Sequence, residues 1–438
     1  MKVLTSIRSV LLIVTIIASS AIFAADYDPD TMTVSAASLL EAESLKGTHY
    51  SIANDVLVSG FINHYTVNSD FGEFIAIGNR NLKKLLHEID AIAELKSMNS
   101  AGVGIDAAVD VVTDTGKSLK TMATHPVDSV HYMGGGLSRL FKRTTKTITD
   151  AGSKVADTVS DTVSGEDDEG DDDAGMSDAA SKVTSSYLGI GKAQREIARE
   201  LEVDPYSDNP VLQAELARVA KVSGTVGKIT NILIPIPSVV GIATDVSDMV
   251  WKLSPTDLLI QNQETLEALG YSEELIQRFF SNKVYSPTEQ TAFVAAVKSL
   301  NGVKGREVLL EGAVNVVSEI EGEFMVRAAL FAHLYDEQVD PITELLKSPI
   351  GSVPVAITRS GNGLIFAPLD MLLWTEDVES TIAEVALLMD EHGGSNKHLL
   401  WIEGDVSALA LASLEFAGWV ESSAAFDKLH AIMKDEAH

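Results

Sequence analysis

The sequence predicts a mainly α protein with α+β parts: N-terminal strands plus a helix, a central helical region and a small C-terminal α+β module. Three observations support this fold class. Over residues 48–77 apolar residues alternate loosely with polar ones, as in strands that bury one face. Over 79–96 and through much of 186–350 they recur every three or four residues, as in amphipathic helices. After residue 351 strand and helix patterns alternate, which is typical of an α+β module.

Residues 1–24 have the order of a secretory signal peptide. Lys2 and Arg8 give a positive start, an apolar stretch follows, and small residues precede an expected cut after Ala24. The alternative is a retained membrane anchor, but the apolar stretch is shorter than the roughly 20 residues that span a bilayer. We therefore expect an exported protein with no transmembrane helix after cleavage. The periplasm is the expected location, and the extracellular medium is the alternative.

The composition narrows the classes of partner and cofactor. The chain has 63 acidic and 33 basic residues, and its formal net charge of −30 would repel nucleic-acid phosphates. It has no cysteine, which excludes disulfides, cysteine-ligated zinc and a cysteine nucleophile. His125 and His131 could ligate one metal, but no third ligand is evident near them. We expect no metal site, no cofactor, and other cell-envelope proteins as partners.

The N-terminal domain is expected to cover residues 25–149. Its strands are followed by a helix over 79–96, whose leucines and isoleucines share one face. His87 and Glu88 fall beside that apolar face, so we expect both to point to solvent and not to bind a metal.

The main basic cluster of the chain lies near the end of this domain. Arg139, Lys142 and Arg143 surround Phe141, and such a strip could lie on an anionic membrane surface. Packing as an ordinary amphipathic helix is the favoured interpretation, since any surface helix shows the same pattern. The four residues remain candidates for peripheral membrane contact.

Residues 150–185 are predicted to form a disordered acidic linker. The run Glu166–Asp173 repels itself and contains no apolar side chain to bury. Its spacing does not match the alternating ligands of an EF-hand calcium loop, so a solvated linker is favoured over a cation site.

A helical domain is expected over residues 186–350. Ser254 and Ser286 each precede a proline, and Ser286 also has Glu289 three residues later, which completes a capping box. The longest helix should run from about Gly305 to Glu337.

Glu323, Arg327 and Arg306 are the candidates for ligand binding. Arg327 falls on the apolar stripe of the longest helix, where a charged side chain needs a partner. Glu323 stands one turn earlier in the favoured acid-before-base order, so a structural Glu323–Arg327 pair is the simpler interpretation. The alternative is an arginine held in a cleft to bind an anionic ligand through its bidentate fork.

Residues 351–438 predict the small α+β module. Ser360–Gly363, between two apolar runs, indicates a hairpin. A helix over 375–392, a strand over 399–402 and a helix over 408–417 are expected to follow.

Three of the chain's four tryptophans, Trp374, Trp401 and Trp419, lie in this module. They could line a groove for a sugar or a peptide, but core packing is the more usual role. Asp370 and Asp405 follow expected strands, where functional groups often lie. We favour a helix cap as the role of Asp405.

Three stretches resemble a run shared by exported proteobacterial proteins of unassigned function: Tyr187–Gly189, Arg195–Ala198 and Val203–Leu212. Three others fit the same pattern: Ser286–Thr288, Gly305–Arg306 and Trp401–Ser407. The resemblance would extend over most of the chain after the signal peptide. It implies no activity.

The common catalytic motifs are missing from the sequence, so no catalytic residue is assigned. There is no Gly-x-Ser-x-Gly elbow, no phosphate-binding Gly-x-x-x-x-Gly-Lys and no His-Glu-x-x-His. We therefore expect a non-catalytic cell-envelope protein that binds or scaffolds other proteins. The alternatives are a hydrolase of an envelope polymer with an unrecognised acid pair, and a membrane-active secreted effector.

Overall fold

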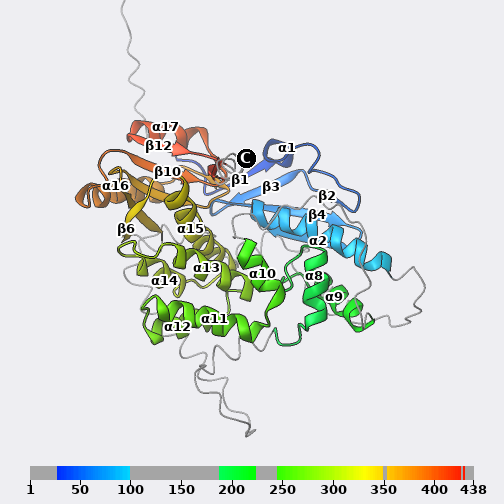
Figure 1. The fold of residues 1–438 in the computed structure, drawn as a ribbon. Coiled ribbons are helices and arrows are strands. Elements are labelled where there is room, and N and C mark those ends of the chain that lie inside the picture. Colours follow the sequence, from blue (N-terminus) through cyan, green and yellow to red (C-terminus); the bar gives the residue numbers. More distant parts are fainter. Residues whose placement is uncertain (1–26, 99–186, 223–243, 349–352, 426–427, 430–438) are drawn as a thin grey trace, which may run out of the picture.

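A computed structural model describes residues 27–98, 187–222, 244–348, 353–425 and 428–429. Helices predominate over several small sheets, which confirms the predicted fold class (Figure 1). Several sequence-based predictions lie outside the described residues: the signal peptide over 1–24, His125, His131, the basic strip and the acidic linker. Within the described ranges, no helix has the length and apolar character needed to cross a membrane.

An antiparallel sheet forms the N-terminal part. Its strands are β1 (Thr31–Ser35), β2 (Tyr50–Ile52), β3 (Asp55–Ser59), β4 (Ile62–Ser69) and β5 (Gly72–Ile77), and a short helix α1 (Ala36–Leu39) follows β1. The strand order is β1-β3-β4-β2, and β5 also pairs with β4. In β3, β4 and β5 buried positions alternate with more accessible ones, as predicted. Strand β1 was not predicted.

Helix α2 (Asn79–Ser97) is covered on two sides. One side packs on the sheet, and the other packs on α8 (Lys192–Glu200) and α9 (Pro210–Val222). The expectation that His87 and Glu88 face solvent is therefore wrong, because these side chains lie under the connection between α8 and α9. They are 8% and 3% exposed.

The central region consists of helices joined by short turns. They are α10 (Thr244–Lys252), α11 (Pro255–Ala268), α12 (Glu273–Phe280), α13 (Pro287–Ser299), α14 (Glu307–Ala313) and α15 (Glu319–Gln338). Ser254 and Ser286 cap α11 and α13 through capping boxes, as their Ser-Pro sequences predicted.

The single helix expected from Gly305 to Glu337 is wrong, because the chain breaks between α14 and α15. Ser318 accepts the backbone N–H of Glu321, and the Glu321 carboxylate accepts the backbone N–H of Val317 at 2.9 Å. The first bond satisfies one of the donors that a new helix start leaves exposed, and the second ties the residue before the cap to the first turn. The Ser-x-x-Glu signal for this start is present in the sequence.

A mixed sheet organises the C-terminal module. Its strands are β6 (Ile342–Lys347), β7 (Pro354–Thr358), β8 (Gly363–Ala367), β10 (His398–Ile402) and β12 (Trp419–Ser422), in the order β12-β10-β8-β7-β6. The predicted hairpin is the antiparallel β7–β8 pair, whereas β8, β10 and β12 run parallel. The sheet begins with β6, within the segment that the sequence assigned to the helical domain. A small second sheet pairs β9 (Met371–Leu372) with β11 (Asp405–Val406).

Helices cover both faces of this sheet, which explains why β7 and β8 are buried at every position. From α15, Phe331 stacks on Phe366 of β8 with ring centroids 6.2 Å apart. On the other face, Met389 of α16 (Glu376–Glu391) lies against Gly363. Helix α17 (Ala408–Phe416) packs beside β12.

The tryptophans of the module pack in or against the core. Trp374 and Trp419 are 6% and 4% exposed, and Trp401 packs edge-on against Tyr335 with centroids 4.9 Å apart. The cap of α17 is Ser407, whose hydroxyl oxygen accepts the backbone N–H of Ala410. The prediction of Asp405 as the cap is therefore wrong.

The β3–β4 hairpin joins the N-terminal sheet to the C-terminal module. Its turn residues Gly60 and Phe61 both have positive φ, at 57° and 68°. Phe61 is 3% exposed in the main core, and its carbonyl accepts the backbone N–H groups of Asp370 and Met371, each at 3.1 Å. In Figure 1 the blue strands accordingly lie beside the orange and red elements, so parts on either side of the predicted linker pack together.

Candidate functional site

A cleft opens where the N-terminal sheet, helix α15 and the C-terminal module meet. It encloses about 360 Å³ of space between atoms, part of it open to solvent. Five ionisable side chains line it: Arg80, Glu323, Arg327, Asp370 and Glu403. We call it the junction cleft. Its apolar wall includes Ile62, Ile77, Ile320, Phe324 and Pro368.

Arg80 stands in the first turn of α2 and reaches across the cleft towards α15. Its Nε lies 3.6 Å from Oε1 of Glu323, while Asn81 Nδ2 donates to Oε2 of the same carboxylate at 2.8 Å. Burial lowers the pKa of Arg80, and the like charge of Arg327 lowers it further, although nearby carboxylates oppose both effects. Burial and Arg327 thus outweigh the nearby carboxylates in their effect on the pKa of Arg80.

Arg327 is held by a residue from the C-terminal module. Its Nε donates to Oε2 of Glu403 at 3.0 Å, and its Nη2 donates to Oε1, so the contact is bidentate. The sequence named Glu323 as the structural partner of Arg327. The bidentate partner is Glu403, 76 residues further along the chain, and Glu323 bonds to Asn81 and approaches Arg80. Arg327 is 4% exposed, so the Glu403 pair orients it firmly at the cleft wall.

Asp370 sits at the floor of the cleft, 7% exposed. Its Oδ2 accepts the backbone N–H of Asn63 at 2.9 Å, and its Oδ1 accepts that of Asn79 at 3.1 Å. Burial raises the pKa of Asp370 to about 7, even though both N–H bonds favour the ionised form. The same segment is closely packed: a Cβ on Gly404 would lie 2.1 Å from the Asp370 carbonyl oxygen.

Arg306, the third candidate for ligand binding named from the sequence, lies outside the junction cleft. Its Nη2 donates to the carbonyl of Leu269 at 2.6 Å, and its guanidinium lies 5.9 Å from the Tyr271 ring centroid. These contacts secure the α11–α12 turn. The structure thus brings Glu323 and Arg327 together in one cleft and leaves Arg306 out of it.

Sequence reasoning missed Arg80 and Glu403. Arg80 is one of several polar residues at the start of a correctly predicted helix, and no local pattern distinguishes it. Glu403 lies in the Trp401–Ser407 stretch, which carried a resemblance but no assigned role. Both residues can be recognised as parts of one site only in the folded structure, where the β3–β4 hairpin lies against the C-terminal module.

A second buried network, made of hydrogen bonds, gives part of the Val203–Leu212 stretch a structural role. Ser207 Oγ donates to Oε1 of Glu88 at 2.6 Å, and Asn209 Nδ2 donates to Oε2 at 2.9 Å. The Asn209 side-chain oxygen also accepts the N–H of Val211 and so caps α9. This network holds α2 against the loop before α9, so its role is structural.

Of the two arginines of the junction cleft, Arg327 is held by Glu403, so Arg80 is the one placed to bind an added anionic group. In the part of the chain that the structure describes, no group of three or more histidines and acids is placed to hold a metal ion.

No protein-family model matches the chain, and neither does any curated protein or solved structure with which it was compared. The resemblance to exported proteobacterial proteins therefore stays a prediction.

Proposed function

We propose that this protein is an exported, non-catalytic binding protein of the cell envelope, and that its junction cleft receives a carboxylate of a partner protein. The observation that carries the proposal is Arg80, a partly exposed cation at the wall of a cleft that is open to solvent. Its side chain is 32% exposed, and its ion pair with Glu323 is long, so a second carboxylate can reach the guanidinium. Binding sites also occur preferentially where separate parts of a fold meet.

The acids of the cleft support a binding role over a hydrolytic one. Asp370 accepts two backbone N–H groups, Glu403 holds Arg327, and Glu323 accepts from Asn81. A hydrolase needs an acid pair that exchanges protons with its substrate. Each of these three acids already holds a hydrogen bond or an ion pair between parts of the fold. Export rests on the signal-peptide pattern of residues 1–24.

The test is gentle crosslinking in the native cells, followed by fractionation of the periplasm, the membranes and the medium. We expect one reproducible partner in the periplasmic fraction. Arg80→Gln should abolish its recovery, whereas Arg278→Gln should not, because Arg278 is an exposed arginine on α12 that contacts Asn315.

Two results would contradict the proposal. Unchanged recovery of the partner with Arg80→Gln would remove the junction cleft from the interaction. Recovery of the protein in the medium, or in membranes that resist a high-salt wash, would favour the secreted effector.

A further inference from the structure

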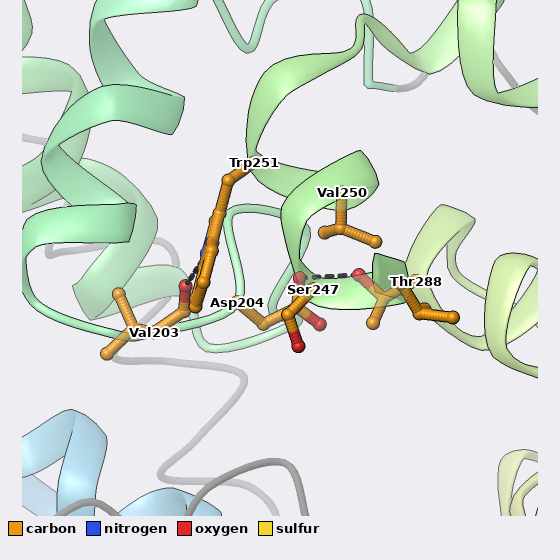
Figure 2. Close-up of a pocket in the computed structure, with 7 residues that line it drawn as sticks. Val203, Asp204, Ser247, Val250, Trp251 and Thr288 are labelled. Carbon is orange, nitrogen blue, oxygen red and sulfur yellow. Dashed lines mark hydrogen bonds between the residues drawn. The ribbon is translucent and has the colours of Figure 1, made fainter. Parts of the chain in front are cut away.

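A second hollow lies between helix α10, the loop after α8 and the start of α13 (Figure 2). It encloses about 290 Å³ of space between atoms, part of it open to solvent. Three valines form its apolar wall: Val203, Val246 and Val250. Four residues add polar or aromatic surface: Asp204, Ser247, Trp251 and Thr288. We call it the Trp251 hollow, and it shares no lining residue with the junction cleft.

Trp251 is fixed at the wall of this hollow. Its indole Nε1–H donates to the carbonyl of Val203 at 3.0 Å, a bond drawn as a dashed line in Figure 2. The ring therefore keeps one orientation and needs no ordering when a ligand arrives. A preorganised indole is the best aromatic surface for a cation.

Among the residues that the structure describes, one carboxylate oxygen of Asp204 accepts no hydrogen bond. Its Oδ1 accepts both the backbone N–H of Tyr206 at 2.9 Å and the hydroxyl of Thr288 at 2.7 Å. Within the described ranges, neither Asp204 Oδ2 nor the Ser247 hydroxyl has a hydrogen-bond or ion-pair partner. Figure 2 shows both residues between Trp251 and Thr288. Two residues that carry acceptors thus line a mainly apolar hollow beside an aromatic ring.

The surroundings favour positive charge. Burial lowers the pKa of the neighbouring Lys84, but Glu88, Asp208 and Asp204 together raise it well above its ordinary value. Of these acids, Asp204 lines the hollow and Asp208 lies four residues further along the same loop. Lys84 pairs with Asp208 at 3.2 Å, so the carboxylate of Asp204 is the acid that acts on the hollow itself. The carboxylate of Asp204 in the wall would repel an anionic ligand and attract a cation.

We propose that the Trp251 hollow binds an ammonium group carried on a short apolar stem. Asp204 Oδ2 and the Ser247 hydroxyl accept its N–H groups, the indole of Trp251 contacts the charge or the stem, and the valines enclose the stem. The same chemistry occurs in a lysine side chain of a partner protein and in a small free amine. The site stands independently of the junction cleft and of the role proposed for it.

The experiment is a titration of the purified protein followed by tryptophan fluorescence and calorimetry. The probes are n-butylammonium, its neutral counterpart n-butanol, and Nα-acetyl-lysine methylamide. We expect n-butylammonium to bind and to change an emission component that Trp251→Phe removes, and n-butanol not to bind. A higher affinity for the lysine derivative would indicate a protein side chain as the source, and a higher affinity for n-butylammonium a free amine.

Matched variants identify the acceptor. Asp204→Asn keeps the Oδ1 acceptor and the side-chain shape, and should weaken n-butylammonium binding by roughly tenfold or more, because a charged hydrogen bond is lost. Asp248→Asn removes the same charge one residue after Ser247, at an exposed position that pairs with Lys252, and should change the affinity less than about twofold.

Two outcomes would overturn the proposal. One is binding of n-butanol as tight as that of n-butylammonium, which the wild-type protein alone decides even if Asp204→Asn fails to fold. The other is a folded Asp204→Asn variant, with an unchanged circular dichroism spectrum, that binds n-butylammonium as the wild type does.

Discussion

The carboxylate of Asp370 caps helix α2 by accepting the backbone N–H of Asn79, 291 residues earlier in the chain. The residue at the cap position of this helix is Gly78, which has no side chain and adopts φ of 102°. Asp370 supplies the missing acceptor from the C-terminal module, and it also binds the N–H of Asn63. The start of α2 therefore depends on a segment that is remote in sequence.

Asp370→Ala should lower the free energy of unfolding by about 1–3 kcal/mol, because it removes a cap and leaves buried N–H groups without acceptors. Urea denaturation followed by circular dichroism measures the loss. The matched change Asp248→Ala, on the exposed face of α10, should cost less than about 0.5 kcal/mol. Equal effects from the two substitutions would contradict the capping role.

Gly404→Ala tests the close approach of two segments at the same junction. The new Cβ would lie 2.1 Å from the Asp370 carbonyl oxygen. This is a backbone atom, so no side-chain rotation can relieve the clash. The expected cost is on the order of 1–3 kcal/mol, measured by urea denaturation. Gly189→Ala, where a Cβ meets nothing within 4 Å, is the control and should be nearly neutral. A Gly404→Ala protein as stable as the wild type would mean that this segment packs differently.

The raised pKa of Glu289 predicts a distinct dependence of stability on pH. Burial raises its pKa to about 7, whereas the unfolded chain titrates near 4.5. Between these values the native state binds more protons than the unfolded state, so the free energy of unfolding falls as pH rises. The contribution of protonated Glu289 is fully present below pH of about 4.5 and is lost as pH rises through about 7.

Glu289→Gln removes this titration and keeps the atoms of the capping box with Ser286. Its stability relative to the wild type should therefore rise between these two pH values and then level off. Parallel stability curves for the two proteins, from urea denaturation at each pH, would show that Glu289 does not titrate in this range. Asp370, whose pKa is raised in the same direction, contributes equally to both curves.

Local signals predicted most elements of the fold. The Ser-Pro starts of α11 and α13, the β7–β8 hairpin and the apolar face of α2 depend on residues close together in sequence. The break at Ser318 was also encoded locally, and a continuous apolar stripe concealed it. Strand and helix identity is a short-range property here, so periodicity and capping residues suffice for it.

The candidate site was predicted only in part, because its contacts join residues far apart in sequence. Arg327 was recognised as a charge that needs a partner, but a single sequence cannot distinguish Glu403 from Glu323. Glu88 was assigned to solvent because its partners Ser207 and Asn209 lie on a loop more than a hundred residues away. Periodicity reports which face of a helix is apolar, and it does not report which polar residues a second layer will cover.

The Arg327–Glu403 pair gives the sharpest test of how the C-terminal module is attached. Arg327→Met removes one partner of a largely buried bidentate pair and should cost about 3–5 kcal/mol, since Glu403 then keeps an uncompensated charge. The double variant Arg327→Met, Glu403→Leu should recover part of that loss, because it removes both charges and adds apolar contact. Lys252→Met, which breaks an exposed pair on α10, is the control and should cost less than about 1 kcal/mol. A double-mutant cycle from urea denaturation measures the coupling, and additive losses would mean that the two residues do not stabilise each other.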